Sequence, residues 1–271
     1  MRKIYQNDRK NDRSDAHILA RLARFDPQLL EPIRHRSATM QADLATIRAR
    51  ETLVTARTKC VNAMRGLVKS MGARLPKCST ESFCKRVTAD IPAELETALR
   101  PLMTVLQTIN EQIRCCDKQI ETLATETYPQ TALLRQVGGV GALTASAFVL
   151  TIADATRFAK SRDIGAYVGL VPRQDDSGDR SSQLHITKAG DPYLRRLLVG
   201  SAQYIVGPFG PDTDLRRYGE RLMQRGGKNA KKRAIVAVAR KLAVLLHRLW
   251  ITGEVYQPLR NSNRQTSTKA A

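Results

Sequence analysis

Aromatic residues and acids are both scarce in this 271-residue sequence. Aromatic side chains make up 5% of it, which argues against a surface built mainly from platforms that stack on bases. Lysine and arginine number 45 and aspartate and glutamate number 25, so the formal net charge is +20. Such an imbalance favours a polyanionic partner, usually nucleic acid. Ribosomal and membrane-surface proteins share this composition, so charge alone leaves those classes open.

The sequence also lacks cysteines at C-x-x-C spacing and long hydrophobic runs. The cysteines are odd in number and form no C-x-x-C pair, which argues against a disulfide framework or a zinc site; they are Cys60, Cys78, Cys84, Cys115 and Cys116. No run of 18 apolar residues could span a membrane, and no signal peptide is recognisable at the start. We therefore expect a cytoplasmic, nucleoid-associated protein with reduced thiols and no membrane partner.

The spacing of apolar residues predicts a mainly α fold. One helix is expected over residues 14–24 and ends where Asp26-Pro27 follows. A long helix is expected over about 38–71, and residues 72–92, rich in turn formers, indicate a break. Beyond the break, apolar residues alternate spacings of four and three for four heptads: Leu95, Leu99, Leu102, Leu106, Ile109, Ile113, Cys116, Ile120 and Leu123.

This heptad row predicts that the two long helices form an antiparallel coiled-coil hairpin. A row this regular fits packing within one chain and equally fits pairing with a second subunit. A homo-oligomer held by the coiled coil is therefore one of two outcomes.

Three glycines, Gly138, Gly139 and Gly141, separate two apolar helical stretches in the segment 127–154. A helix, a tight glycine turn and a second helix would bring backbone N–H groups up to a phosphate at the second helix's N-terminus. The pattern resembles a helix-hairpin-helix DNA-binding motif. Glycine turns between core helices are also common, so a purely structural role stays open.

Asp191 and Pro192 suit the N-cap and first turn of a helix that extends to about residue 206. Candidate nucleic-acid contacts lie before and within this helix: Lys188, Arg195 and Arg196. The final helix, about 229–252, begins amid further candidates, which oppose its macrodipole: Lys228, Lys231, Lys232 and Arg233. A bound phosphate would remove this conflict, whereas a solvated basic turn is the plain alternative.

Six blocks, in order, carry a resemblance to a known family. They are "RKNDRSDAHILARLARFDPQLLEP", "RTKCVNAMRGLVKSMGARLP", "LLRQVGGVGALTASAF", "FAKSRDIGAYVGLVPRQDDSG", "ITKAGDPYLRRLLVGSA" and "KKRAIVAVARKLAVLLHRLW". Together they resemble the DEDD-type insertion-sequence transposases of the IS-one-ten family, in its IS-eleven-eleven branch, over residues 3–256. No single block is decisive, and the specificity lies in six blocks with the right gaps.

The resemblance implies an RNase H-like catalytic domain with four acidic residues that bind Mg²⁺, a coiled-coil connection and an α-helical C-terminal transposase domain with a serine nucleophile. It also implies a recombinase that joins element and target DNA as an oligomer, with both DNAs specified by a structured bridge RNA, a guide RNA. The domains are then expected at 1–36 (a remnant of the catalytic domain), 37–127 (coiled coil), 128–258 (transposase domain) and 259–271 (a disordered tail).

Asp12 and Asp15 match the last two acids of the family's tetrad. Residues three apart share a helical face, so two carboxylates there can jointly hold a hard cation that prefers oxygen ligands, such as Mg²⁺. Acids in a first helical turn are also favoured by the helix dipole alone. Local sequence by itself would favour that structural role.

Ser177, in "PRQDDSGDRSS", matches the family's nucleophilic serine. A serine before a glycine on a loop allows an exposed hydroxyl and the close approach of a phosphate. Attack on phosphorus would form a covalent phosphoserine–DNA link, and a weakly acidic hydroxyl needs a base or a metal for this. Ser181 and Ser182 are rivals for the same alignment position, and a plain polar turn is the default without the resemblance. A lone histidine, His185, does not by itself indicate a base.

The sequence departs from the family pattern upstream of Asp12. The first two acids of the tetrad belong on strands of the RNase H-like sheet, yet eleven residues precede Asp12 and Asp8 is the sole acid among them. Two carboxylates from one helix form a poor site for a cation that prefers near-octahedral geometry. We therefore expect an N-terminally truncated or mis-started member that binds nucleic acid and lacks strand transfer alone. A non-catalytic nucleic-acid-binding protein and a coiled-coil oligomerisation adaptor are the alternatives.

Overall fold

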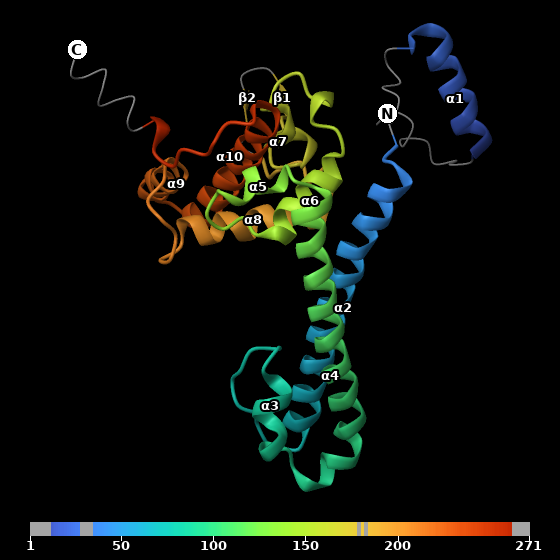
Figure 1. Cartoon of the computed structure of the whole chain (residues 1–271), viewed down its shortest axis with the longest axis vertical. Coiled ribbons are helices and arrows are strands. Elements are labelled where there is room, and N and C mark those ends of the chain that lie inside the picture. The colour runs from blue at the N-terminus through green and yellow to red at the C-terminus, as the bar shows by residue number, and fades with distance from the viewer. Residues whose placement is uncertain (1–11, 28–34, 178–179, 182–183, 262–271) are drawn as a thin grey trace. The chain divides into compact units, whose positions relative to one another are not determined.

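The computed structural model describes residues 12–27, 35–177, 180–181 and 184–261 (Figure 1). Backbone contacts divide the chain into two compact units, Met1–Ser37 and Ala38–Ala271. The described residues are mainly α-helical, as the sequence predicts. Residues 262–271 of the predicted tail and the rival serine Ser182 lie outside the described residues.

The first unit contains the helix α1 (Asp12–Phe25), which begins two residues earlier and ends one residue later than the sequence predicts. It carries acids in its first turn and Arg24 in its last turn, an arrangement that suits the helix dipole. None of its residues is buried, and Leu19 and Phe25 are 38% and 86% exposed.

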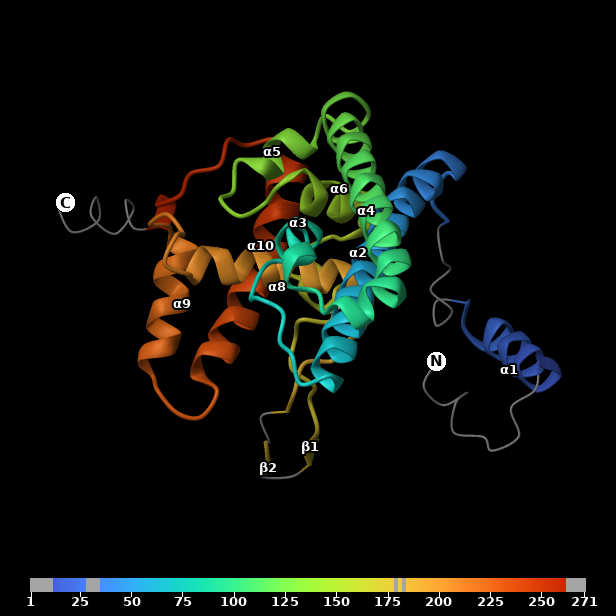
Figure 2. The same ribbon diagram turned by 90° about the horizontal axis from the view of Figure 1, so that it is seen from below.

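In the second unit, α2 (Ala38–Ser70) and α4 (Ala93–Thr122) lie side by side in both views (Figures 1 and 2). Arg50 pairs with Asp117 and Arg57 donates to Asn110. Rising residue numbers in one helix therefore meet falling numbers in the other, so the two helices are antiparallel. We call α2, α4 and the residues between them the arm.

The segment 72–92 contains a short helix that the sequence analysis did not predict. It consists of α3 (Phe83–Val87), followed by the 3₁₀ turn η3 (Thr88–Asp90). Phe83 and Val87 are fully buried against the ends of α2 and α4. A five-residue helix is too short to show a hydrophobic period, and burial of these two side chains stabilises it where local sequence alone favours a turn.

The predicted heptad row divides into two halves of different burial. The residues seven apart are buried, between 0% and 4% exposed: Leu99, Leu106, Ile113 and Ile120. The alternating row is half-buried and begins at Leu95 and Leu102. A buried asparagine, Asn110, which the row does not include, bonds to Arg57 across the interface. One row of α4 therefore packs against α2, and the coiled-coil description of the arm stays a prediction.

The remaining elements form what we call the body (Figure 1). Its helices are η4 (Leu123–Thr127, a π-helical turn), α5 (Thr131–Arg135), α6 (Ala142–Ile152), η5 (Ala155–Arg157), α7 (Asp163–Tyr167), α8 (Pro192–Val206), α9 (Asp214–Gln224) and α10 (Ala230–Thr252). Two short antiparallel strands, β1 (Asp176–Ser177) and β2 (Arg180–Ser181), form a ribbon between α7 and α8.

The body core forms around α6 and α10. Helix α6 is apolar and is buried from Thr144 to Ile152, as expected for a helix that packs on all sides. Helix α10 buries one face and leaves the other accessible. His247, 1% exposed, makes ring-nitrogen hydrogen bonds to Ser161 Oγ (3.0 Å) and the Ala155 carbonyl (2.9 Å), which fix α10 to the η5–α7 loop.

Polar bonds hold the arm to the body. The Tyr128 hydroxyl donates to Asp43 at 2.6 Å, and Arg48 forms an ion pair with Asp191. Leu44 and Ile47 of α2 also belong to the body's hydrophobic cluster. The base of the arm is therefore part of the same core as the body.

No helix in the described ranges is both long enough and apolar enough to cross a membrane.

Candidate nucleic-acid interface

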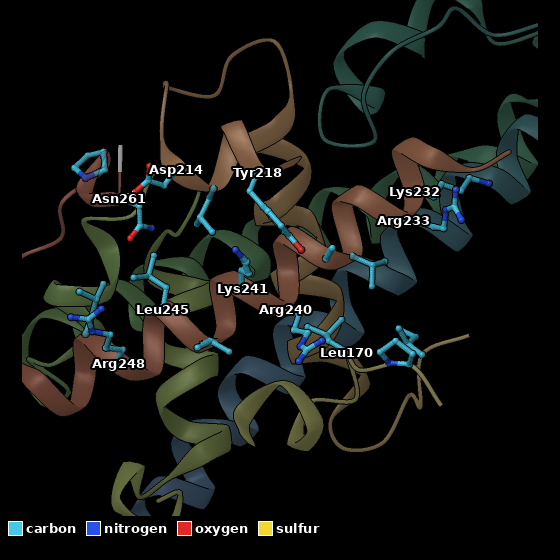
Figure 3. Close-up of a pocket in the computed structure, with 18 of the residues that line it drawn as sticks. Leu170, Asp214, Tyr218, Lys232, Arg233, Arg240, Lys241, Leu245, Arg248 and Asn261 are labelled. Atoms are coloured by element: carbon cyan, nitrogen blue, oxygen red, sulfur yellow. Dashed lines mark hydrogen bonds between the residues drawn. The ribbon is translucent and has the colours of Figure 1, made fainter. Parts of the chain in front are cut away.

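A groove of about 1130 Å³ runs along the accessible face of α10 (Figure 3). Its floor repeats along α10 at helical spacing: Asn229, Lys232, Arg233, Val236, Ala237, Arg240, Lys241, Val244, Leu245, Arg248 and Leu249. Residues three and four apart lie on one helical face, so a single stripe of α10 faces the groove. Figure 3 shows Arg248 toward one end of this stripe and Lys232 and Arg233 at the other.

Three other segments form the walls of the groove. One wall is α9, through Leu215 and Tyr218. Another is the stem of the β-ribbon, through Leu170 and Pro172 before the ribbon and Leu184, His185, Ile186 and Lys188 after it. Residues 254–261 close the groove. They are fixed in place because Asp214 N–H donates to the Pro258 carbonyl at 2.8 Å and Asn261 N–H donates to the Asp214 carboxylate at 2.7 Å.

The groove is cationic, and most of its cations form no ion pair with a described residue. Arg248 and Arg260 both pair with Glu254, at 2.9 and 2.6 Å, and those hydrogen bonds lower the pKa of Glu254. The six others lining the groove have no carboxylate within ion-pair distance among the described residues: Lys188, Lys228, Lys232, Arg233, Arg240 and Lys241. Unpaired cations concentrated in one concavity raise the local positive potential.

Lys241 packs against an aromatic ring in the groove. Its Nζ is 3.7 Å from the centroid of the Tyr218 ring. Burial, with the nearby charge of Arg221, lowers the pKa of the Lys241 ammonium, because both disfavour the charged form. A phosphate placed in the groove would oppose that shift.

The start of α10 is the most basic end of the groove. Asn229, the N-cap, has φ 66° and its side chain caps no backbone N–H. Lys228, Lys231, Lys232 and Arg233 are all exposed. Three of these predicted contacts line the groove, and Lys231 does not. Lys188, from the opposite wall, joins them although it is distant in sequence.

The structure gives the predicted contacts Arg195 and Arg196 partners within the protein. Arg195 donates to the carbonyls of Val168 (3.0 Å) and Ala189 (2.7 Å). Arg196 pairs with Glu51 of α2 at 2.6 Å. These two side chains therefore brace α8 against neighbouring segments, and neither lines the groove.

The glycine turn between α5 and α6 packs closely on the α8 region. Gly139 has φ +86°, and a Cβ there would lie 2.8 Å from the Tyr204 ring. A Cβ on Gly138 would lie 3.2 Å from Pro211. Gly141, the N-cap of α6, is exposed with open space around it. Close packing explains two of the glycines, and only Gly141 leaves room for a ligand.

Ser177 lies in β1, where its backbone pairs with Arg180 in β2. The ladder continues toward the body through an isolated bridge between Pro172 and Ile186. Because both bridge residues line the groove, the strand that bears Ser177 rises directly from the groove wall. Figure 2 shows the ribbon extending away from the helices of the body.

Asp12 and Asp15 lie in the first turn of α1, the former exposed and the latter half-buried. In the part of the chain that the structure describes, no three histidine, cysteine or acidic side chains gather closely enough to hold a metal ion. These two carboxylates therefore do not form a Mg²⁺ site on their own, since such a site needs further oxygen ligands.

Four residues line the groove without having been predicted from the sequence: Tyr218, Arg240, Lys241 and Arg248. A signal for the cations was present, because Arg233 and Arg240, and likewise Lys241 and Arg248, are seven residues apart. Seven residues are close to two turns of helix, so the two cations of each pair lie on one face. Tyr218 gave no local signal, since α9 brings it to the groove only through tertiary packing.

Comparison with known proteins identifies the family. Residues 131–219 match the model described as "Transposase IS116/IS110/IS902 family", and residues 1–72 match a DEDD-type IS110 model described as "Transposase". The chain is 33% identical over 264 residues to the "Probable family 20 transposase" of Pseudomonas aeruginosa, which covers 94% of this chain and 76% of that protein.

Two further relatives agree. The "Transposase for insertion sequence element IS1111A" of Coxiella burnetii is 28% identical, over 94% of this chain and 70% of that protein. The "Transposase for insertion sequence element IS1328" of Yersinia enterocolitica is 33% identical, over 72% of this chain and 58% of that protein. This chain belongs to the IS110/IS116/IS902 family of insertion-sequence transposases.

Proposed function

We propose that this chain binds nucleic acid through the groove along α10, as part of a transposase that exchanges DNA strands. The observation that carries the proposal is the row of six cations in one groove with no acid paired to them in the described structure. Lysine and arginine neutralise backbone phosphates, and the released counterions supply sequence-independent affinity. The net charge of +20 supports the same partner.

Ser177 is the proposed nucleophile. In the reaction its Oγ forms a bond to the phosphorus of a DNA phosphodiester while one ester P–O bond breaks. The serine loses its proton, and the leaving oxygen departs as a DNA hydroxyl that takes one up. Attack by a hydroxyl of a second DNA strand then reverses these steps, which joins the strands and regenerates the serine. The rise of the Ser177 strand from the groove wall supports this role.

Asp12 and Asp15 are proposed as two ligands of a Mg²⁺ site whose other ligands come from outside the described residues. Mg²⁺ would supply charge neutralisation at a phosphate. Since no described cluster completes such a site, we propose that this chain alone binds nucleic acid without exchanging strands. An RNase H-like setting for α1 is part of the same proposal.

We further propose a guide RNA and a second copy of the chain as partners. The resemblance to the IS-eleven-eleven branch supports the RNA, together with the relative of the IS1111A element. The half-buried row of α4 supports pairing of arms as a coiled coil. The exposed N-cap Gly141 supports a secondary, helix-hairpin-helix-like phosphate contact.

Salt-dependent binding to fluorescein-labelled DNA and RNA tests the groove. The triple variant Lys228→Gln, Lys232→Gln, Arg233→Gln removes three groove cations. Its slope of log affinity against log salt should be shallower by roughly two than that of the wild type. The matched control is Lys59→Gln, Lys69→Gln, Lys85→Gln, which removes three exposed arm cations and should change little. Equal losses in both triples would refute the groove as the binding site.

Strand joining tests Ser177 separately. In any preparation that joins DNA strands, Ser177→Ala should abolish joining and leave binding nearly intact, and Asp15→Asn should do the same. Ser181→Ala is the matched control, because Ser181 pairs with Asp176 in the same ribbon. Joining that survives Ser177→Ala and is lost with Ser181→Ala would transfer the nucleophile role to Ser181.

A further inference from the structure

The lining of the groove contains apolar side chains as well as cations. Leu170, Pro172 and Ile186 line it from the ribbon stem, and Val244 and Leu245 line it from α10. Two further lining side chains are large, apolar and exposed: Leu184 at 36% and Val255 at 71%. Apolar side chains from two separate segments that are left exposed in one concavity indicate a surface that a ligand covers.

Double-stranded nucleic acid does not fit this combination. A duplex presents phosphates and groove edges on its outside and hides the faces of its bases by stacking. Phosphates would meet the cations, but the apolar side chains of the lining would gain nothing from a duplex backbone. An unpaired strand presents both phosphates and the faces of its bases, which matches a lining that contains both cations and apolar side chains.

We propose that the groove along α10 takes an unpaired stretch of nucleic acid, with phosphates on the α10 cations and bases against the apolar side chains of the lining. This inference rests on the proposed nucleic-acid function of the same groove and names the form of its ligand. Pockets for small ligands run to about 1,000 Å³, so a groove of about 1130 Å³ holds only a few nucleotides.

The aromatic content fits this mode of binding. Stacking platforms are rare in the sequence, and the groove contains Tyr218 and Tyr256. One face of Tyr218 is occupied by the Lys241 ammonium, so most base contacts fall on aliphatic side chains. Such contacts carry little sequence preference, because every base has an apolar face.

The test compares a 12-nucleotide fluorescein-labelled DNA strand with the same strand annealed to its complement. The variant Leu184→Ser, Val255→Ser removes two apolar contacts and no charge. Because both side chains are exposed, it leaves the core untouched. We expect it to weaken single-strand binding roughly tenfold and to leave duplex binding within twofold. The matched control Leu67→Ser changes a leucine of the arm that is 43% exposed and should change neither.

The outcomes separate this inference from the proposed function. If the cation triple weakens single strand and duplex equally and Leu184→Ser, Val255→Ser is silent, the groove binds nucleic acid but not as an unpaired strand. The same conclusion follows if the duplex binds the wild type more tightly than the single strand. If the cation triple is silent with every nucleic acid, the proposed function fails as well.

Discussion

Lys241 and Tyr218 form a cation–π pair inside the groove, with the lysine Nζ 3.7 Å from the ring centroid. The pair joins α9 to α10 and places an ammonium where burial lowers its pKa. Because the pKa of Lys241 lies below the ordinary lysine pKa of 10.5, the groove loses part of its positive charge at a lower pH than an ordinary lysine would give.

The Lys241–Tyr218 pair predicts that the affinity of the groove for nucleic acid begins to fall at a lower pH than the pKa of an ordinary lysine would give. Only the charged amine attracts a phosphate, so affinity should fall as pH rises through the lowered pKa of the free protein. Lys241→Gln should weaken binding at neutral pH and remove this early decline, as measured by anisotropy titrations along a pH series. Lys228→Gln, the control, should weaken binding yet retain the decline. An unchanged pH profile in Lys241→Gln would contradict the assignment.

Alanine substitutions at Gly139 and at Gly200 should change the free energy of unfolding in opposite directions. Gly139 has φ +86° and no room for a Cβ beside Tyr204, so Gly139→Ala should lower the free energy of unfolding by at least about 1–2 kcal/mol. Gly200 lies within α8 with open space around it. Gly200→Ala should therefore raise that free energy by about 0.5–1 kcal/mol. Urea denaturation of the two variants measures both, and equal signs would overturn the packing account.

The Arg57–Asn110 bond predicts non-additive stability in the arm. Asn110→Leu leaves a guanidinium partly buried without its acceptor, which should cost about 1–3 kcal/mol. The double variant Arg57→Met, Asn110→Leu removes both polar groups and should recover most of that loss. Chemical denaturation compares the three proteins. A double variant less stable than Asn110→Leu would show that Arg57 acts through some other contact.

Tyr128 predicts a measurable link between arm and body. The residue Tyr128 is 7% exposed, and its hydroxyl donates to Asp43 at 2.6 Å. Burial together with that hydrogen bond raises the pKa of the Tyr128 hydroxyl. Tyr128→Phe should lower the free energy of unfolding by about 1–2 kcal/mol, since a hydrogen bond to a charged group is lost. Tyr204→Phe is the control, as Tyr204 is 46% exposed, and its stability should match the wild type.

The helix boundaries could be predicted where local signals decide them. The expected helices 38–71, 192–206 and 229–252 are α2 (Ala38–Ser70), α8 (Pro192–Val206) and α10 (Ala230–Thr252). The N-cap decides where α8 begins: Asp191 accepts a hydrogen bond from Leu194 N–H at 2.8 Å, as the Asp-Pro pair predicts. In contrast, α3 escaped prediction because the burial of Phe83 and not its local pattern stabilises it.

The candidate site could be predicted only in part. The cations that begin α10 were visible as a charge run, whereas the groove needs Tyr218, Lys188 and Lys241 brought together from separate segments. Arg195 and Arg196 also have partners within the protein, namely carbonyl oxygens and Glu51, and their contact with nucleic acid stays a prediction. Local sequence does not distinguish an arginine that stabilises the fold from an arginine that binds a phosphate.

The most direct test of the central claim is photo-crosslinking of a bound oligonucleotide that carries 5-iodouracil, followed by mass spectrometry of the linked peptides. Binding in the groove predicts crosslinks within residues 228–261 of α10 and its closing segment, and within 170–188 of the ribbon stem. Crosslinks confined to the arm, residues 38–122, or to α1 would contradict it, because the nucleic acid would then lie away from the groove.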